Sequence, residues 1–256
     1  MTNYVRARKE GERRILPSRR LGWILFVAFV VASSLPARPF CSEPQPRLIC
    51  AEYFASQLVV EATLVNTEKE LWKNDPDGIL ARVYTLRVNR NLRGELTETI
   101  RVYEENDSGR AAFDWVRGRK YLLFLFHTRG KTTWSLDGCG NSGPVAKAAR
   151  ALAVIEQVKS RGGSGFIHGR ASDEVLSSGL SGVRVEVSGA AGRFSAKTNS
   201  RGNFRIEVPP GNYSVMSART DDGDVFETSD ISYIDGKNIQ IQPGGCAQIQ
   251  LFRVKR

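Results

Sequence analysis

The sequence predicts an all-β protein in which a small closed barrel with one C-terminal helix precedes a β-sandwich. Three observations support this prediction. Short apolar and β-branched runs recur in the first half, one helical period follows them, and a second series of short strands begins after residue 165. The chain has 256 residues, of which 41% are hydrophobic and 25% are charged. This composition is ordinary for globular proteins, and the length leaves room for two small domains.

Five strands are expected in the first domain, which we place at residues 38–159. Their residues are β-branched, aromatic or apolar, and turn residues such as Gly94 separate them. The expected strands are residues 57–65, 82–88, 98–103, 121–126 and 134–136. The fourth strand is apolar throughout, as the central strand of a sheet is. A small closed barrel accommodates such strands with a helix packed on them.

The helix of this domain is expected over residues 145–159. The apolar residues of one face recur at helical spacing, and they are Ala148, Leu152 and Ile155. Pro144 suits the first helical position, because its missing N–H has no helical partner there. Ser142 or Gly143 is expected to cap this end of the helix.

A glycine- and serine-rich linker is expected at residues 160–165, followed by a sandwich domain at residues 166–256. Residues 182–189 alternate strictly between apolar and other side chains, so their three valines share one face. Further strands are expected at or near residues 194–198, 203–208, 213–218, 224–228, 238–241 and 247–254. Short strands with a turn signal about every 8–12 residues are typical of a β-sandwich.

Residues 1–37 have the features of a secretory signal peptide. A basic segment ends at Arg20, and an uninterrupted apolar run covers residues 21–32. As a helix, this run spans about 18 Å, which is less than the ~30 Å hydrocarbon core of a bilayer. We therefore expect cleavage near Arg38 and a secreted or periplasmic mature chain. The alternative is an uncleaved single-pass anchor through residues 21–37, and only this anchor would bring the protein to a membrane.

Four cysteines, Cys41, Cys50, Cys139 and Cys246, are expected to form two disulfides. An even number of cysteines behind an export signal favours this interpretation, and three connectivities are open. The cysteines are far apart in sequence, without the C-x-x-C or close histidine spacing of a zinc site. We therefore expect no metal and no cofactor.

The charge pattern argues against a nucleic-acid partner. The formal net charge is +10, but much of it lies in residues 1–37. After residue 37 we find no stripe of lysine and arginine with interleaved aromatic residues, which a nucleic-acid-binding face would have. The remaining charge favours solubility and a mild attraction to anionic surfaces.

No catalytic residue is expected. The chain lacks a G-x-S-x-G motif, and it has only two histidines, His127 and His168. Each histidine is interpreted as an edge or turn residue. Residues 221–224, Asp-Asp-Gly-Asp, are interpreted as a solvated turn and not as a cation site, because no bidentate glutamate follows them. The sequence therefore favours a protein that is not an enzyme.

Tryptophans are the residues most suited to hold a partner. Trp72 and Trp115 are the candidates for a ligand platform, whereas Trp134 is expected in the core. Trp72 lies in a charged stretch, and this favours exposure of its ring.

Two parts of the chain resemble known families. Residues 41–158 resemble the netrin-like domain of the tissue inhibitors of metalloproteinases, an OB-fold barrel also carried by bacterial secreted proteins. The matching motifs are residues 56–65, 84–94, 118–125 and 139–144. Residues 165–254 look like the carboxypeptidase regulatory-like domain, a transthyretin-like sandwich with a carbohydrate-binding-like fold. The matching motifs are residues 167–169, 180–189, 198–204 and 208–215.

The first resemblance implies that Cys41 pairs with Cys139, and it leaves Cys246 as the partner of Cys50. Free Cys50 and Cys246, or Cys50 in place of Cys41, are the open alternatives. The inhibitors begin with Cys-x-Cys, and Pro39 stands where the first of these cysteines would fall. The predicted function is therefore a non-enzymatic binding or structural protein of the cell envelope that engages a protein or a glycan. A metalloproteinase-inhibitor-like protein and a membrane-anchored spacer are the alternatives.

Overall fold

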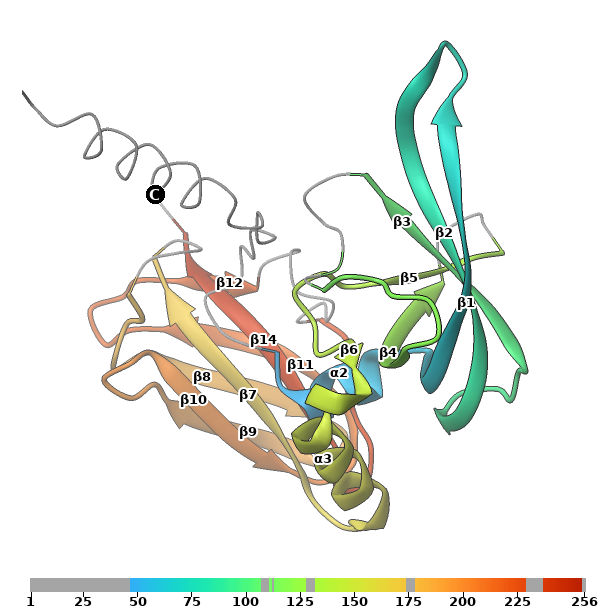
Figure 1. The fold of residues 1–256 in the computed structure, drawn as a ribbon. Helices are drawn as coiled ribbons and strands as arrows, with labels where there is room; N and C mark the ends of the chain where they lie inside the picture. The colour runs from blue at the N-terminus through green and yellow to red at the C-terminus, as the bar shows by residue number, and fades with distance from the viewer. Residues whose placement is uncertain are drawn as a thin grey trace, which may run out of the picture. The chain divides into compact units, whose positions relative to one another are not determined.

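The computed structural model describes residues 47–106, 111, 113–127, 132–173, 178–228 and 237–254, which all belong to one compact unit. The all-β prediction is confirmed: these residues form a closed barrel, two α-helices and a two-sheet sandwich (Figure 1). Within the described residues, no helix is long and apolar enough to cross a membrane. The predicted signal peptide, its alternative anchor and the cleavage site lie outside the described residues.

The barrel closes through the strand order β1-β2-β3-β5-β4, with β4 pairing back onto β1. Its strands are β1 (Leu58–Trp72), β2 (Asp75–Arg93), β3 (Thr99–Glu105), β4 (Lys120–His127) and β5 (Trp134–Leu136), and the short β6 (Gly143–Pro144) pairs with β4. The β3–β5 pair is parallel, and the other strand pairs are antiparallel. Alternate residues of the strands point inward and fill the barrel, as in other small barrels.

β1 and β2 are much longer than the sequence predicts. β4 pairs with β1 only up to Thr63, and β3 pairs with β2 only from Ala81 onward. Among the described residues, β1 from Asn66 onward therefore has β2 as its only strand neighbour, and β2 before Ala81 has only β1. Figure 1 shows this part of the two strands as a hairpin that projects beyond the other barrel strands. We call residues 66–80 the arm. The sequence prediction stopped short of it because no face of β1 is buried after Leu64, so no apolar alternation marks the strand.

Two helices cover one outer side of the barrel. α2 (Ile49–Ala55) was not expected, although Cys50 and Phe54 are four residues apart and both pack against the same apolar cluster. Its C-terminal end is held by Arg93, whose guanidinium donates to the carbonyl oxygens of Phe54 and Ser56 at 3.2 and 3.0 Å. These contacts satisfy carbonyl groups that a helix end leaves unpaired.

The second helix begins later than expected. Residues Val145–Lys147 form a 3-10 turn (η1), and α3 covers Ala149–Ser160. Pro144 pairs with β4 in β6 and is not the first helical residue. No side chain caps either segment, and Ser142 instead accepts a hydrogen bond through its Oγ from the Phe124 N–H at 3.0 Å. The predicted cap is therefore wrong, because the β4 backbone competes for the same hydroxyl group.

The sandwich consists of two four-stranded sheets around one apolar core. One sheet has the order β10-β7-β14-β12, with β7 (Gly165–Ser172), β10 (Asn203–Val208), β12 (Phe226–Thr228) and β14 (Cys246–Arg253). The other has the order β13-β11-β8-β9, with β8 (Arg184–Gly189), β9 (Gly192–Lys197), β11 (Gly211–Arg219) and β13 (Ile239–Ile241). Val183, Val185 and Val187 are completely buried, as the alternation predicts. Between α3 and β7, Gly163 accepts a hydrogen bond at its carbonyl oxygen from the Gly244 N–H at 3.0 Å.

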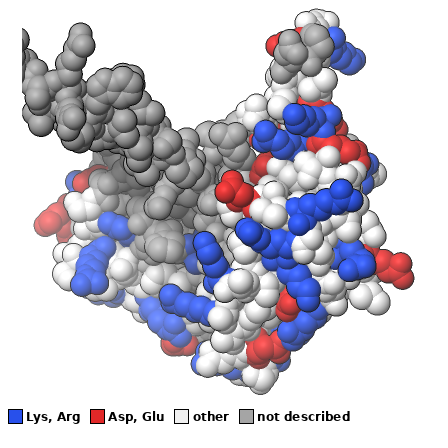
Figure 2. Space-filling view, in the orientation of Figure 1, with Lys and Arg blue, Asp and Glu red and all other residues white. Residues whose placement is uncertain are grey.

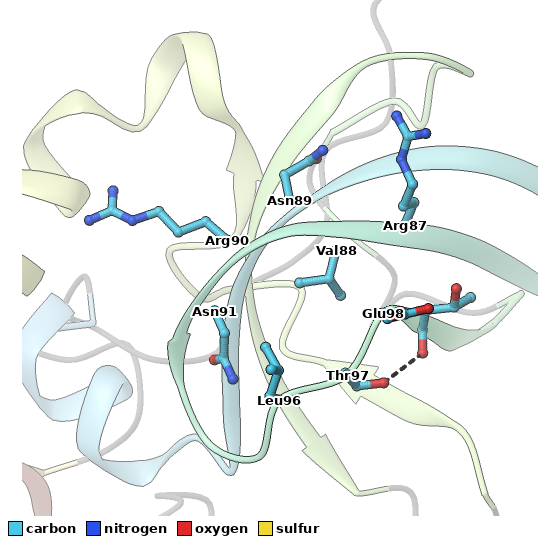
Figure 3. A pocket seen from close by; sticks show the side chains of 9 residues that line it. Arg87, Val88, Asn89, Arg90, Asn91, Leu96, Thr97 and Glu98 are labelled. Carbon is cyan, nitrogen blue, oxygen red and sulfur yellow. Dashed lines mark hydrogen bonds between the residues drawn. The ribbon is translucent and has the colours of Figure 1, made fainter.

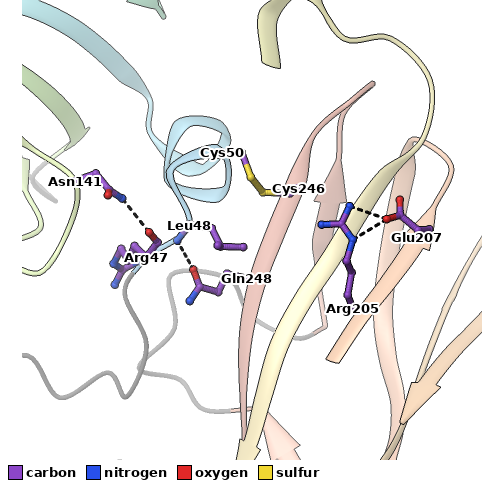
Figure 4. Close-up of a disulfide and its surroundings, with 8 residues drawn as sticks. All are labelled: Arg47, Leu48, Cys50, Asn141, Arg205, Glu207, Cys246 and Gln248. Atoms are coloured by element: carbon purple, nitrogen blue, oxygen red, sulfur yellow. Dashed lines mark hydrogen bonds and ion pairs between the residues drawn. A yellow bond between two sulfur atoms is a disulfide. The ribbon is translucent and has the colours of Figure 1, made fainter. Parts of the chain in front are cut away.

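A disulfide joins α2 to the first residue of β14. It connects Cys50 with Cys246, whose Cα atoms are 5.8 Å apart, so this pairing is confirmed (Figure 4). Nearby, the Leu48 N–H donates to Gln248 Oε1 at 2.7 Å. Cys139 is also disulfide-bonded, but Cys41, its predicted partner, lies outside the described residues. The bond between Cys50 and Cys246 is typical of proteins in an oxidising, non-cytoplasmic compartment.

Candidate functional site

The end of the arm presents an exposed tryptophan beside an exposed leucine. Trp72 is 57% exposed and Leu71 is 46% exposed. Together with the half-buried Leu80, they line a shallow hollow that we call the tip hollow. The hollow is completed by Glu70, Lys73, Asn74 and Asp75. Exposed apolar side chains gathered at one place on a folded protein commonly mark a contact with a partner.

The backbone around the tip hollow is ordered by local contacts. β1 and β2 are joined by Lys73 and Asn74, and the register then shifts so that Trp72 is opposite Asp75 while Leu71 is opposite Ile79. The Gly78 N–H donates to Asp75 Oδ1 at 3.0 Å, which closes the bulged segment. A Cβ atom at Gly78 would lie 3.0 Å from Trp72 Cδ1, so the edge of the indole ring rests against this glycine. A Cβ atom there would also lie 2.5 Å from Asp75 Oδ2, so glycine suits this position because it has no side chain.

Trp115, the other predicted platform residue, lies in a different environment. Its ring stacks on Tyr84 with centroids 4.3 Å apart and also contacts Phe113 and Tyr121. The indole N–H faces Glu104 Oε1 at 3.4 Å, and the Tyr84 hydroxyl donates to Glu104 Oε2 at 3.0 Å. Burial, and secondarily Glu104, raises the pKa of Tyr84 above its ordinary value. Trp115 therefore fills one end of the barrel interior, and one of its faces is already occupied.

A second hollow lies where β2 turns toward β3. Val88, Asn91, Leu96, Thr97 and Glu98 are among its lining residues, and Leu96 is 84% exposed. Figure 3 shows the lining residue Arg90 extending away from the hollow. The polar groups near its floor are engaged internally. The Asn91 amide donates to the Gly94 carbonyl oxygen and accepts from the Arg93 N–H, each at 3.1 Å. The polar side chains of Asn91 and Thr97 are thus engaged within the hollow itself, because the Thr97 hydroxyl donates to the Thr99 carbonyl oxygen at 3.0 Å.

A buried polar cluster connects α2 with the loop that carries Cys139. Glu52 is only 2% exposed, and its Oε2 accepts from the Asn141 N–H at 2.7 Å and from Asn141 Nδ2 at 2.6 Å. Its Oε1 has no hydrogen-bond partner among the described residues. Beside it, Arg47 forms an ion pair with Asp137. Burial raises the pKa of Glu52 to about 7, although Asn141 and Arg47 oppose the change.

The histidines lie on separate strands. His127 ends β4 and stacks on the half-buried Trp134 with centroids 4.0 Å apart. His168 lies in β7 opposite Arg205, and burial lowers its pKa, with a smaller contribution from the Arg205 charge. The structure brings neither histidine to the tip hollow.

The acidic stretch 221–224 forms a turn between β11 and β12, as predicted. The Lys197 ammonium is 2.8 Å from Asp221 and lowers the pKa of this exposed carboxyl, while Asp224 faces Arg253 at 3.5 Å. Within the described part of the chain, no three His, Cys, Asp or Glu side chains gather as metal ligands would.

Sequence reasoning identified Trp72 but not its neighbours. Leu71 is adjacent to Trp72, but Leu80 reaches the tip hollow only through the register of the arm. A signal for the turn existed, because Lys73, Asn74 and Asp75 form a short polar segment between two runs that contain apolar residues. Glu52 was missed because nothing in its local sequence marks a glutamate as buried.

Comparisons with known proteins add no relative. No protein-family model matches the chain, and no curated protein matches it. A fold alone does not define function, so function is inferred from the residues and contacts of the site itself.

Proposed function

We propose that this chain is a non-enzymatic binding protein that is secreted or periplasmic and engages a protein or a glycan at the cell envelope. In this proposal its netrin-like barrel holds the binding arm, and its carboxypeptidase regulatory-like sandwich is an accessory domain. The observation that carries the proposal is the arm, an ordered hairpin that ends in the exposed side chains of Trp72 and Leu71. A protein that serves only as a spacer does not need such side chains exposed at the end of a hairpin.

The disulfide between Cys50 and Cys246 supports the proposed location. Such bonds persist in oxidising compartments and are rare in the cytosol. The bond also anchors α2, which packs against the outer barrel surface, to the sandwich strand β14. The disulfide is therefore a second covalent connection between the barrel and the sandwich, in addition to the backbone segment that links α3 to β7.

Fractionation and binding together test this proposal. The full chain with a C-terminal tag is expressed in a bacterial host, and its location, N-terminus and cysteine oxidation are measured. We expect an exported protein that begins near Arg38 and has oxidised Cys50 and Cys246. A cytoplasmic protein with both thiols reduced would contradict the proposed location.

Binding is measured by sedimentation of the exported protein with isolated bacterial envelopes. We expect saturable binding, and treatment of the envelopes with a protease or with a muramidase separates a protein ligand from a glycan ligand. The absence of saturable binding to every envelope preparation would contradict the proposed function.

A further inference from the structure

The tip hollow combines an apolar surface with acidic side chains. Trp72, Leu71 and Leu80 provide the apolar part, and Glu70 and Asp75 lie at the same hollow with Lys73. These three charged residues sum to a net charge of −1, whereas the whole chain has a formal net charge of +10. The sign of the charge at the tip hollow is therefore opposite to that of the protein as a whole.

The carboxylates at the hollow differ from those farther down the arm. Glu68 is 3.2 Å from Arg101 and is paired across the strands. Among the described residues, Glu70 forms no ion pair within 4.0 Å, and Asp75 accepts the Gly78 N–H. On the face seen in Figure 2, acidic and basic side chains are interspersed along the arm. Glu70 therefore leaves a negative charge beside the exposed indole ring that a partner can neutralise.

We propose that the tip hollow docks a protein segment in which a basic side chain neighbours an apolar one. A lysine or arginine over the Trp72 ring gains a cation–π contact, and Glu70 supplies the opposite charge. The neighbouring apolar side chain of the partner covers Leu71 and Leu80. This inference rests on the proposed function and identifies the class of its ligand.

The chemistry of the hollow favours this occupant over three others. An anionic bilayer or an acidic glycan would meet the net negative charge of the hollow and be repelled. A neutral glycan would stack on the indole ring, but it would leave Leu71 and Leu80 without an apolar partner and the Glu70 charge without an opposite charge. The contacts of Gly78 with Asp75 and Trp72 hold the hollow in place before binding, which lowers the entropic cost of association.

The test uses the exported, disulfide-bonded protein and a random dodecapeptide library displayed on phage. Selection on the wild-type protein with counter-selection on Trp72→Ala should enrich peptides in which lysine or arginine neighbours an apolar residue. Synthetic copies of these peptides should bind wild-type protein, with affinity about 30-fold weaker for Trp72→Ala, as for a central aromatic contact. Glu70→Lys should also weaken binding, and high salt should weaken binding to wild-type protein.

Two matched variants control for nonspecific effects of surface changes. Leu96→Ala removes another exposed leucine and Glu95→Gln another exposed carboxylate, and both should leave peptide affinity unchanged. Trp72 is exposed, so Trp72→Ala should retain the circular dichroism spectrum and the disulfides of wild-type protein.

Several results would overturn the inference. They are failure to enrich any peptide, enrichment of acidic or purely apolar peptides, and equal binding to Trp72→Ala. Trp72-dependent binding to a glycan array or to anionic phosphatidylglycerol vesicles, without peptide binding, would also overturn it. So would Trp72-dependent self-association in sedimentation velocity. None of these results contradicts the proposed function if the exported protein still binds envelopes. Failure of this inference can therefore be distinguished from failure of the proposed function.

Discussion

Replacing Glu52 by glutamine should change how the stability of the protein depends on pH. The Glu52 side chain is buried, and burial raises its pKa from 4.5 to about 7. The groups that face it are Asn141, which donates two hydrogen bonds, and the Arg47–Asp137 ion pair. In Glu52→Gln an amide oxygen can still accept from Asn141, but no buried charge forms.

The sign of the effect follows from proton linkage. The folded protein binds a proton at Glu52 more tightly than the unfolded chain does, so protonation stabilises the fold. This stabilisation is full below pH 4.5 and is lost as the pH rises to about 7. The difference between these two pKa values corresponds to about 3 kcal/mol over the whole titration. Between pH 5 and pH 8, the free energy of unfolding of Glu52→Gln relative to wild type should therefore increase by about 2–3 kcal/mol.

Denaturant unfolding with the disulfides intact, followed by tryptophan fluorescence from pH 5 to pH 8, measures this difference. Comparison with Glu52→Gln at each pH separates the contribution of Glu52 from that of every other titrating group, because both proteins share the other groups. The exposed Glu98→Gln is the matched control and should differ from wild type by a constant amount. A difference between Glu52→Gln and wild type that does not vary with pH would refute the reasoning, because Glu52 would then be ionised throughout.

Three further changes test the fold. Replacing Cys50 and Cys246 by serine should lower the free energy of unfolding by about 3–5 kcal/mol, because the bond joins residues 196 apart in sequence. Denaturant titration without reducing agent measures this loss. A loss below about 1 kcal/mol would contradict the prediction. Trp115→Ala should lower the free energy of unfolding by about 3 kcal/mol in the same assay, because the indole ring packs in one end of the barrel. A loss of stability no greater than that of a variant at an exposed site would contradict this prediction. Gly94→Ala should lower the melting temperature more than Gly118→Ala. Both glycines have positive φ angles (88° and 80°), but a Cβ at Gly94 would lie 2.3 Å from the Gln57 carbonyl oxygen, whereas one at Gly118 would meet no atom within 4 Å. Equal melting temperatures for the two variants would exclude this clash as a cause.

Local sequence patterns were sufficient to predict the parts of the fold in which pattern and burial agree. Residues 121–126 are apolar throughout and form the buried strand β4, and the valines of residues 183–187 alternate and fill the sandwich core. The exposed Trp72 could also be anticipated, since it lies among charged residues. In the two strands the apolar chemistry of the side chains predicts their burial, and at Trp72 the charged sequence neighbours predict exposure, so no distant contact needs to be known.

Features that depend on contacts between distant residues could not be predicted from local patterns, because those contacts exist only in the folded chain. The arm continues beyond the barrel because β1 and β2 keep pairing after the other strands end, and this register brings Leu80 to Trp72. Ser142 bonds to β4 and does not cap a helix because the Phe124 N–H lies within reach only in the folded chain. Glu52 is buried because α2 packs against the loop of Asn141, 89 residues away in sequence. Its raised pKa arises from that packing, because only folding removes the carboxyl group from water.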